Sequence, residues 1–87
     1  MTEIIIGSKP LSNYMLYAID MIRKGANKLT IRGFKYGSGK ALVLADWLNN
    51  NYGYLPQEIQ LDRSRNGQIG IKITLLSQQT PITKKVV

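Results

Sequence analysis

Apolar side chains recur with two different spacings along the chain, and each change of spacing marks a predicted element. The apolar, β-branched run Ile4–Ile6 is stopped by Gly7, as is typical of a short buried strand. Over residues 11–22 the apolar positions then recur at steps of three and four, which predicts one face of an amphipathic helix. Pro10 suits the first turn of this helix, and Gly25 is the expected stop.

The middle of the chain repeats this order of strand, turn and helix. Apolar and polar residues alternate over residues 28–35, which predicts a second strand. The Gly-Ser-Gly segment 37–39 interrupts the alternation, and Ser38 is the expected N-cap of a second helix. The apolar face of this second helix consists of Ala41, Leu44, Ala45 and Leu48.

The last part of the chain carries a hairpin signal. Two alternating runs, at residues 59–62 and 69–75, surround an Asn-Gly pair. The predicted order is therefore β-α-β-α-β-β, an α+β fold (an α/β sandwich) with two helices on a four-stranded sheet. We expect a single domain over residues 1–76. Residues 77–87 lack any period, which predicts a mobile basic tail.

The charge balance extends the prediction from the fold to the partner. The 87 residues include 12 Lys and Arg against 5 Asp and Glu, which gives a net charge of +7. Such an excess favours nucleic acid as the partner, with an anionic membrane second. A merely soluble basic protein is the plainer alternative.

The residue types that are absent narrow the chemistry. The chain contains no Cys and no His, which excludes disulfides, thiolate or imidazole metal sites, and Cys or Ser–His nucleophilic catalysis. The carboxylates are scattered, so we expect no acid–base pair, no enzymatic activity and no cofactor. The N-terminus lacks a basic leader, and no apolar run approaches the ~18 residues of a membrane span. We therefore expect a soluble, cytoplasmic protein.

Two strand-to-helix junctions carry lysines and form the candidate site. Lys9 follows the first predicted strand, whereas Lys35 and Lys40 flank the break before the second helix. A helix N-terminus presents unpaired N–H groups and a partial positive charge, so phosphate is favoured there. Lysines at two such junctions predict a surface that holds a phosphate backbone. A solvated lysine in an ordinary turn is the alternative at each position.

The segment 37–40, Gly-Ser-Gly-Lys, is not a nucleotide-binding P-loop. That motif needs a Gly five residues before its Gly-Lys pair and a Ser or Thr after it. Those places hold Phe34 and Ala41, so the hydroxyl that would bind magnesium is missing. Nucleotide hydrolysis is therefore not expected.

Four further side chains leave two interpretations open. Phe34 and Tyr36 alternate with Lys35, so their rings could stack on bases or could belong to the core and the strand end. Arg63 and Arg65 lie at the predicted hairpin tip. A basic β-ribbon can enter a DNA groove, and a charged tip can equally prevent edge-to-edge aggregation.

The first junction resembles a known motif. The segment 6–14, Ile-Gly-Ser-Lys-Pro-Leu-Ser-Asn-Tyr, is similar to the Gly-Lys-Lys-Pro-x-x-Asn-Tyr motif of the Alba family of small basic archaeal chromatin and RNA-binding proteins. The resemblance covers about residues 3–76. Later segments that follow in the family's order are 29–32, 40–41 and 55–56.

The resemblance implies the fold of the C-terminal domain of translation initiation factor three. It also implies a homodimer that binds double-stranded nucleic acid, with hairpin arms along the minor groove. By this resemblance, Lys9 and Lys40 match basic positions of the first loop and second helix. Arg32 matches a basic position of the second strand, and Arg63 and Arg65 belong to the arm.

The chain also departs from the family pattern. Ser8 stands where some members carry an acetylated lysine, and the basic residues of the second junction are displaced by one place. The hairpin is shorter than usual in the family. Two extra residues near 52–54 fall where family members pack dimer against dimer.

The sequence therefore predicts a non-enzymatic homodimer, associated with the chromosome or nucleoid, that binds DNA and/or RNA largely without regard to sequence. An RNA-preferring ribonucleoprotein component and a dimeric protein-interaction scaffold are the alternatives. The predicted nucleic-acid-binding residues are Lys9, Lys35, Lys40, Arg32, Tyr36, Arg63 and Arg65.

Overall fold

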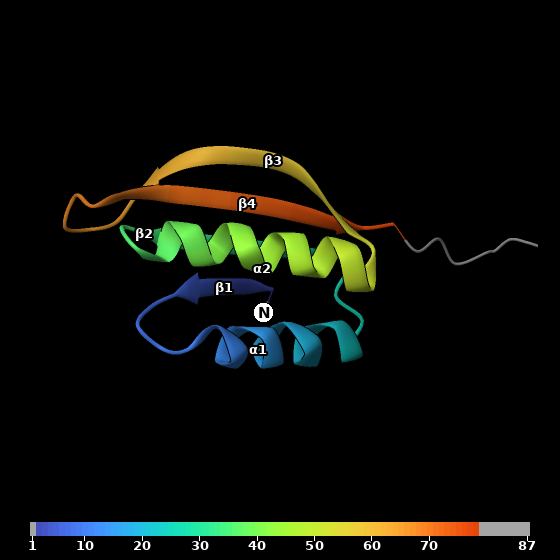
Figure 1. Cartoon of the computed structure of the whole chain (residues 1–87). Coiled ribbons are helices and arrows are strands. Elements are labelled where there is room, and N and C mark those ends of the chain that lie inside the picture. The colour runs from blue at the N-terminus through green and yellow to red at the C-terminus, as the bar shows by residue number, and fades with distance from the viewer. Residues whose placement is uncertain (1, 79–87) are drawn as a thin grey trace, which may run out of the picture.

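Two helices cover one face of a four-stranded mixed sheet in the computed structural model of the protein, which describes residues 2–78 (Figure 1). The predicted fold class and the order β-α-β-α-β-β are confirmed. The elements are β1 (Glu3–Ile6), α1 (Leu11–Arg23), β2 (Lys28–Phe34), α2 (Gly37–Tyr52), β3 (Tyr54–Arg63) and β4 (Ile69–Ser77).

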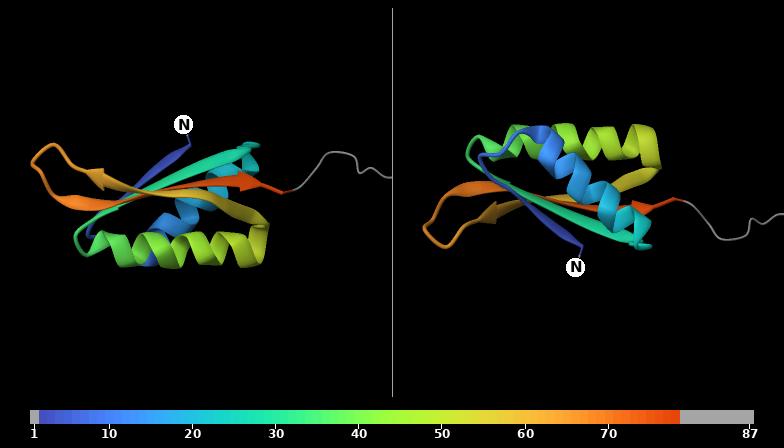
Figure 2. Two further views of the ribbon diagram at one scale, coloured as in Figure 1. Left: turned by 90° about the horizontal axis from the view of Figure 1, so that it is seen from above. Right: turned by 90° about the horizontal axis from the view of Figure 1, so that it is seen from below.

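The strand order brings three loops to one end of the domain. The order in the sheet is β1-β2-β4-β3, with β1 and β2 parallel and the other pairs antiparallel. Ile6 pairs with Gly33, so both parallel strands finish at the same end, where each leads into a helix. Phe34 pairs with Gly70, which places the β3–β4 loop at that end too (Figures 1 and 2). We call this region the loop end.

The core lies between the helices and the sheet face that they cover. Alternate residues of β1, β2 and β4 are buried there, as the period of two predicts, whereas β3 contributes only Tyr54. α2 contributes the four apolar residues that its sequence pattern predicts, and α1 contributes Tyr14 and Ala18. The largest fully buried side chains are Leu29, Ile31, Leu44, Leu48, Ile73 and Leu75.

Ser38 is not the N-cap of α2, so this prediction was wrong. The helix begins at Gly37, and Tyr36 occupies the N-cap position without a side-chain cap. The Ser38 hydroxyl instead donates a hydrogen bond to the carbonyl oxygen of Gly33, 3.2 Å away. The end of β2 supplies an acceptor for this hydroxyl beside the first turn, and α2 begins two residues earlier than it would with Ser38 as its N-cap.

The hairpin strands are longer than the alternating pattern predicts. β3 begins at Tyr54 and includes Pro56, next to a register irregularity between Pro56 and Glu58. A proline is tolerated in an edge strand at such an irregularity because it has no N–H to donate. β4 extends to Ser77, which pairs with Tyr54, so the strand enters the segment predicted as a tail. Residues 79–87 of that predicted tail lie outside the described residues.

The backbone of Gly33 lies in close contact with elements on two sides. A Cβ at Gly33 would come within 2.3 Å of the carbonyl oxygen of Gly37 in the first turn of α2. A Cβ at Gly70 of β4 would come within 2.0 Å of the carbonyl oxygen of Gly33. Real Cβ atoms do not approach a backbone oxygen this closely, so both positions require glycine.

We predict opposite effects from two glycine-to-alanine substitutions. Gly33→Ala should lower the free energy of unfolding by about 2 kcal/mol or more, because α2 or β2 must move to admit the methyl group. Gly39→Ala is the matched control, since nothing lies within 4 Å of its added Cβ and it is helical. It should raise stability by up to about 1 kcal/mol. Urea denaturation at one protein concentration measures both, and equal effects would contradict the close approach.

Candidate nucleic-acid interface

The β1–α1 loop is tied to the helix that follows it. The buried hydroxyl of Tyr14 accepts hydrogen bonds from the backbone N–H groups of Gly7, at 2.8 Å, and Lys9, at 3.2 Å. Tyr14 belongs to the first turns of α1 and is packed in the core. Its two hydrogen bonds therefore fix the position of the β1–α1 loop relative to α1. The conformation of the lysine-bearing turn therefore depends on one buried tyrosine.

Lys9 is exposed but oriented. Its Nζ donates a hydrogen bond to the hydroxyl of Tyr17, at 3.0 Å, and lies 5.7 Å from the centre of the Tyr17 ring. The hydrogen bond with Tyr17 raises the pKa of Lys9 above its ordinary value of 10.5. The lysine thus keeps its charge at neutral pH. Its partner is the neutral hydroxyl oxygen of Tyr17, which orients the ammonium group and does not neutralise its charge.

The β2–α2 loop has an unusual backbone. Lys35 has φ 53°, in the left-handed region that side chains other than glycine rarely adopt. Two backbone hydrogen bonds hold this conformation, from Lys35 N–H to the Ile69 carbonyl at 3.2 Å and from Ser38 N–H to the Lys35 carbonyl at 3.1 Å. Tyr36 follows with its side chain 94% exposed. Strain of this kind is common at functional sites.

The two lysine-bearing junctions form one surface. Lys40 Nζ donates a hydrogen bond to the backbone carbonyl of Lys9, at 3.0 Å, and so bridges the loops. Gly37 is buried against Ile6, since a Cβ there would come within 3.2 Å of the Ile6 carbonyl oxygen. A cavity of about 350 Å³ lies between the loops. It is lined by Ile6, Gly7, Ser8, Phe34, Lys35, Tyr36, Gly37, Lys40 and Gln68.

Arg63 and Arg65 lie next to this surface, on the hairpin. The predicted hairpin is confirmed, with a loop over residues 64–68 in which Gly67 has φ 83°. Arg63 donates a weak hydrogen bond to the Gly67 carbonyl at 3.4 Å, and Arg65 is exposed. Gln68, at the base of the loop, lines the cavity of about 350 Å³ between the two junctions, which we call the junction cavity. The hairpin tip therefore continues the basic loop end.

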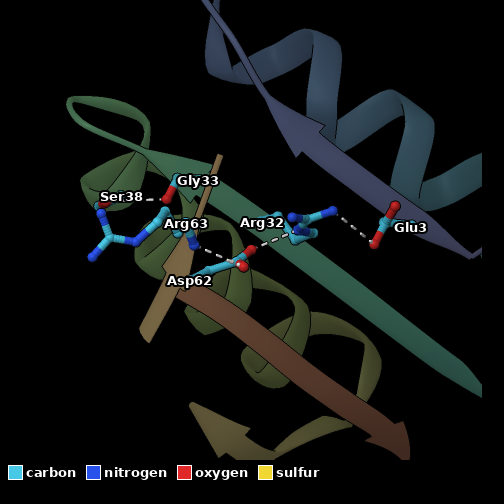
Figure 3. A network of polar contacts seen from close by, with 6 residues as sticks. All are labelled: Glu3, Arg32, Gly33, Ser38, Asp62 and Arg63. Atoms are coloured by element: carbon cyan, nitrogen blue, oxygen red, sulfur yellow. Dashed lines mark hydrogen bonds and ion pairs between the residues drawn. The ribbon is translucent and has the colours of Figure 1, made fainter. Parts of the chain in front are cut away.

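Arg32 lies apart from the predicted lysines and is joined to Arg63 through Asp62, whose Oδ1 accepts a hydrogen bond from the Arg63 N–H at 2.9 Å. Its neighbour Gly33 faces α2, so Arg32 points to the sheet face without helices. Arg32 Nε is 2.6 Å from Asp62 Oδ2, and Nη1 is 3.7 Å from Glu3 Oε2 (Figure 3). The guanidinium also lies over the Phe34 ring. Hydrogen bonding to Arg32 lowers the pKa of Asp62, so the pair is ionised at neutral pH. Arg32 thus links β1, β2 and β3.

The cations of the described chain differ in the kind of partner that they contact. The ion pairs among residues 2–78 involve Arg32, with its two carboxylates, and Lys24, which lies 3.1 Å from Asp20 at the far end of α1. Lys9 and Lys40 contact a hydroxyl and a carbonyl instead. The charges at the loop end are therefore not neutralised by these contacts.

Sequence reasoning did not identify three residues of this arrangement. Tyr17 orients Lys9, Gln68 lines the cavity, and Asp62 engages Arg32. The spacing of Tyr14 and Tyr17, one helical turn apart just after Lys9, could have indicated the first contact. The other two depend on strand pairing, which the local pattern does not reveal.

Other kinds of site are not apparent in the part of the chain that the structure describes. Within residues 2–78, His, Cys, Asp and Glu form no group of three or more that could hold a metal ion. Neither of the helices described is long and apolar enough to cross a membrane.

The mixed sheet, with both helices on one face and the basic loops at one end, defines a small Alba-type α+β domain. The structure is similar to Alba from Thermoplasma volcanium, with a TM-score of 0.73 and 27% identity over 86% of this chain and 99% of that chain. ALBA1 from Trypanosoma brucei, at 10% identity, shows the same fold, with a TM-score of 0.74 over 87% of this chain and 69% of that one. No family model matches the sequence. The structural match therefore supports a relationship to the Alba proteins, whose fold this chain shares.

Proposed function

We propose that the protein binds double-stranded DNA or RNA without catalysis, through phosphate contacts at the loop end. The observation that carries this proposal is the junction itself, where Lys40, in the first turn of α2, contacts the backbone of Lys9 in the β1–α1 loop. Lys35 borders the same cavity as Lys40. Three ammonium groups on one rigid surface suit a row of phosphates better than a single small anion.

Binding of this kind is governed by electrostatics. Each lysine that neutralises a phosphate releases condensed counterions, so affinity falls steeply as salt rises. Lysine is a flexible point charge that contacts phosphate and does not by itself read bases, so little sequence preference is expected. Arg63 and Arg65 would contact phosphates that lie farther along the groove. This mode fits a role in chromosome or ribonucleoprotein architecture.

We predict that the salt dependence of binding identifies the lysines involved. Lys9→Gln and Lys40→Gln should each reduce the slope of log K against log salt by about 1, because one phosphate contact is lost. Lys24→Gln is the matched control, since Lys24 is exposed, paired with Asp20 and at the opposite end of α1. Fluorescence anisotropy with matched DNA and RNA duplexes measures the slopes.

These titrations also separate the functional alternatives. Equal affinities for the two duplexes would indicate general backbone binding, and a strong RNA preference would indicate the ribonucleoprotein role. Absence of binding to either duplex at physiological salt would contradict the proposed function. The protein would then be better described as an interaction scaffold.

We further propose a homodimer formed through the hairpin. Ile59, Leu61 and Ile69 make an apolar strip on the face of β3 and β4 that continues the core, since Ile59 pairs with the buried Ile73. Their side chains are nonetheless 57%, 83% and 58% exposed, because the strip extends past the helices. A contiguous exposed strip on a small domain favours association, and a second copy would also supply a second loop end.

We predict that one charge on this strip disrupts the dimer. Leu61→Lys should shift the protein to monomer, because association would bury an unpaired ammonium group. Gln60→Lys is the control, since it adds the same charge to the adjacent exposed residue, which points to the opposite face of β3. Analytical ultracentrifugation measures both. A dimer that survives Leu61→Lys unchanged would place the interface elsewhere.

A further inference from the structure

The junction cavity is lined by aromatic and carboxamide residues that phosphate binding alone does not require. Its lining includes the aromatic residues Phe34 and Tyr36 and the carboxamide residue Gln68, as well as Lys35 and Lys40. Its volume of about 350 Å³ is within the size range of small-ligand sites. None of the described residues that line it carries a carboxylate, so the cavity favours a ligand with negative charge.

The ring of Tyr36 is presented by a fixed backbone. The left-handed Lys35 precedes it and is held by hydrogen bonds to Ile69 and Ser38, and the helical Gly37 follows, packed on Ile6. The side chain itself is almost fully exposed, so the core gains little from it. An exposed aromatic side chain on a rigid turn, between two lysines, is suited to stacking on a flat group with an attached phosphate.

We propose that this cavity accepts one unpaired nucleotide of the bound nucleic acid, with its base on Tyr36 and its phosphate at Lys35 and Lys40. A base inside a duplex is covered on both faces by its neighbours, so only an unpaired base can stack on protein. The preferred ligand is then a duplex that carries a bulge or a junction with a single strand. The inference rests on the proposed function and specifies the kind of nucleic acid that it selects.

The experiment compares two duplexes that differ by one nucleotide. The first is fully paired, and the second carries a single 2-aminopurine bulge, both made as RNA and as DNA. The full chain should bind the bulged duplex at least about fivefold more tightly than the paired one, as expected for one stacked base. The fluorescence of 2-aminopurine should fall on binding, because stacking on Tyr36 quenches it.

Variants at Tyr36 test the stacking directly. Tyr36→Ala should reduce the ratio of the two affinities to about 1, whereas Tyr36→Phe should preserve it, because the ring is retained. Since Tyr36 is exposed, both variants should fold, and circular dichroism verifies this. Adenosine monophosphate is added as a competitor, and it should not displace the bulged duplex at the concentrations used for the duplex.

The possible outcomes distinguish failure of this inference from failure of the proposed function. Tight but equal binding of the paired and bulged duplexes, or an affinity ratio that Tyr36→Ala leaves unchanged, would overturn this inference alone. Displacement by the free nucleotide would overturn it in favour of a mononucleotide site. Loss of binding to all duplexes would overturn the proposed function and this inference with it.

Discussion

The close backbone approach at Gly33 is the constraint on which the loop end depends. Gly33 admits the first turn of α2 on one side, while Gly70 lets β4 approach its carbonyl on another. Because β1 runs parallel to β2, the end of β1 lies beside that first turn, and Gly37 packs on Ile6. The two lysine-bearing loops meet only because these backbones come so near. The arrangement of the loop end therefore depends on glycines, whose lack of a side chain lets the backbones come this close.

The basic residues at the loop end and on the open sheet face have different kinds of partner. Lys9 and Lys40 are oriented by a tyrosine hydroxyl and a backbone carbonyl, which fix the ammonium groups and leave their charge available. Arg32 is used differently, since Asp62 and Glu3 hold it as a link across the sheet. The basic residues thus differ in their contacts: Lys9 and Lys40 at the loop end are not paired with carboxylates, whereas Arg32 joins strands on the open sheet face.

The periodicity of the sequence was sufficient to predict the six elements, their order and most of the core, because burial imposes a period of two or 3.6 on each element. It was not sufficient for Ser38, whose hydroxyl finds an acceptor on a neighbouring strand. Nor could it place Arg32 relative to Lys9 and Lys40, because this depends on which face each residue of β2 presents and on the pairing of β3. Local pattern determines elements, whereas tertiary contacts determine which basic side chains are available.

The central claim is that nucleic acid binds at the loop end. A titration of the isotope-labelled protein with a short duplex, followed by amide NMR, tests it residue by residue. The account predicts that the largest shift changes occur at residues 7–9, 35–40 and 64–68, with little change at Lys24 and Gly53 at the opposite end. Largest changes around Lys24 and Gly53, with the loop end unaffected, would contradict it.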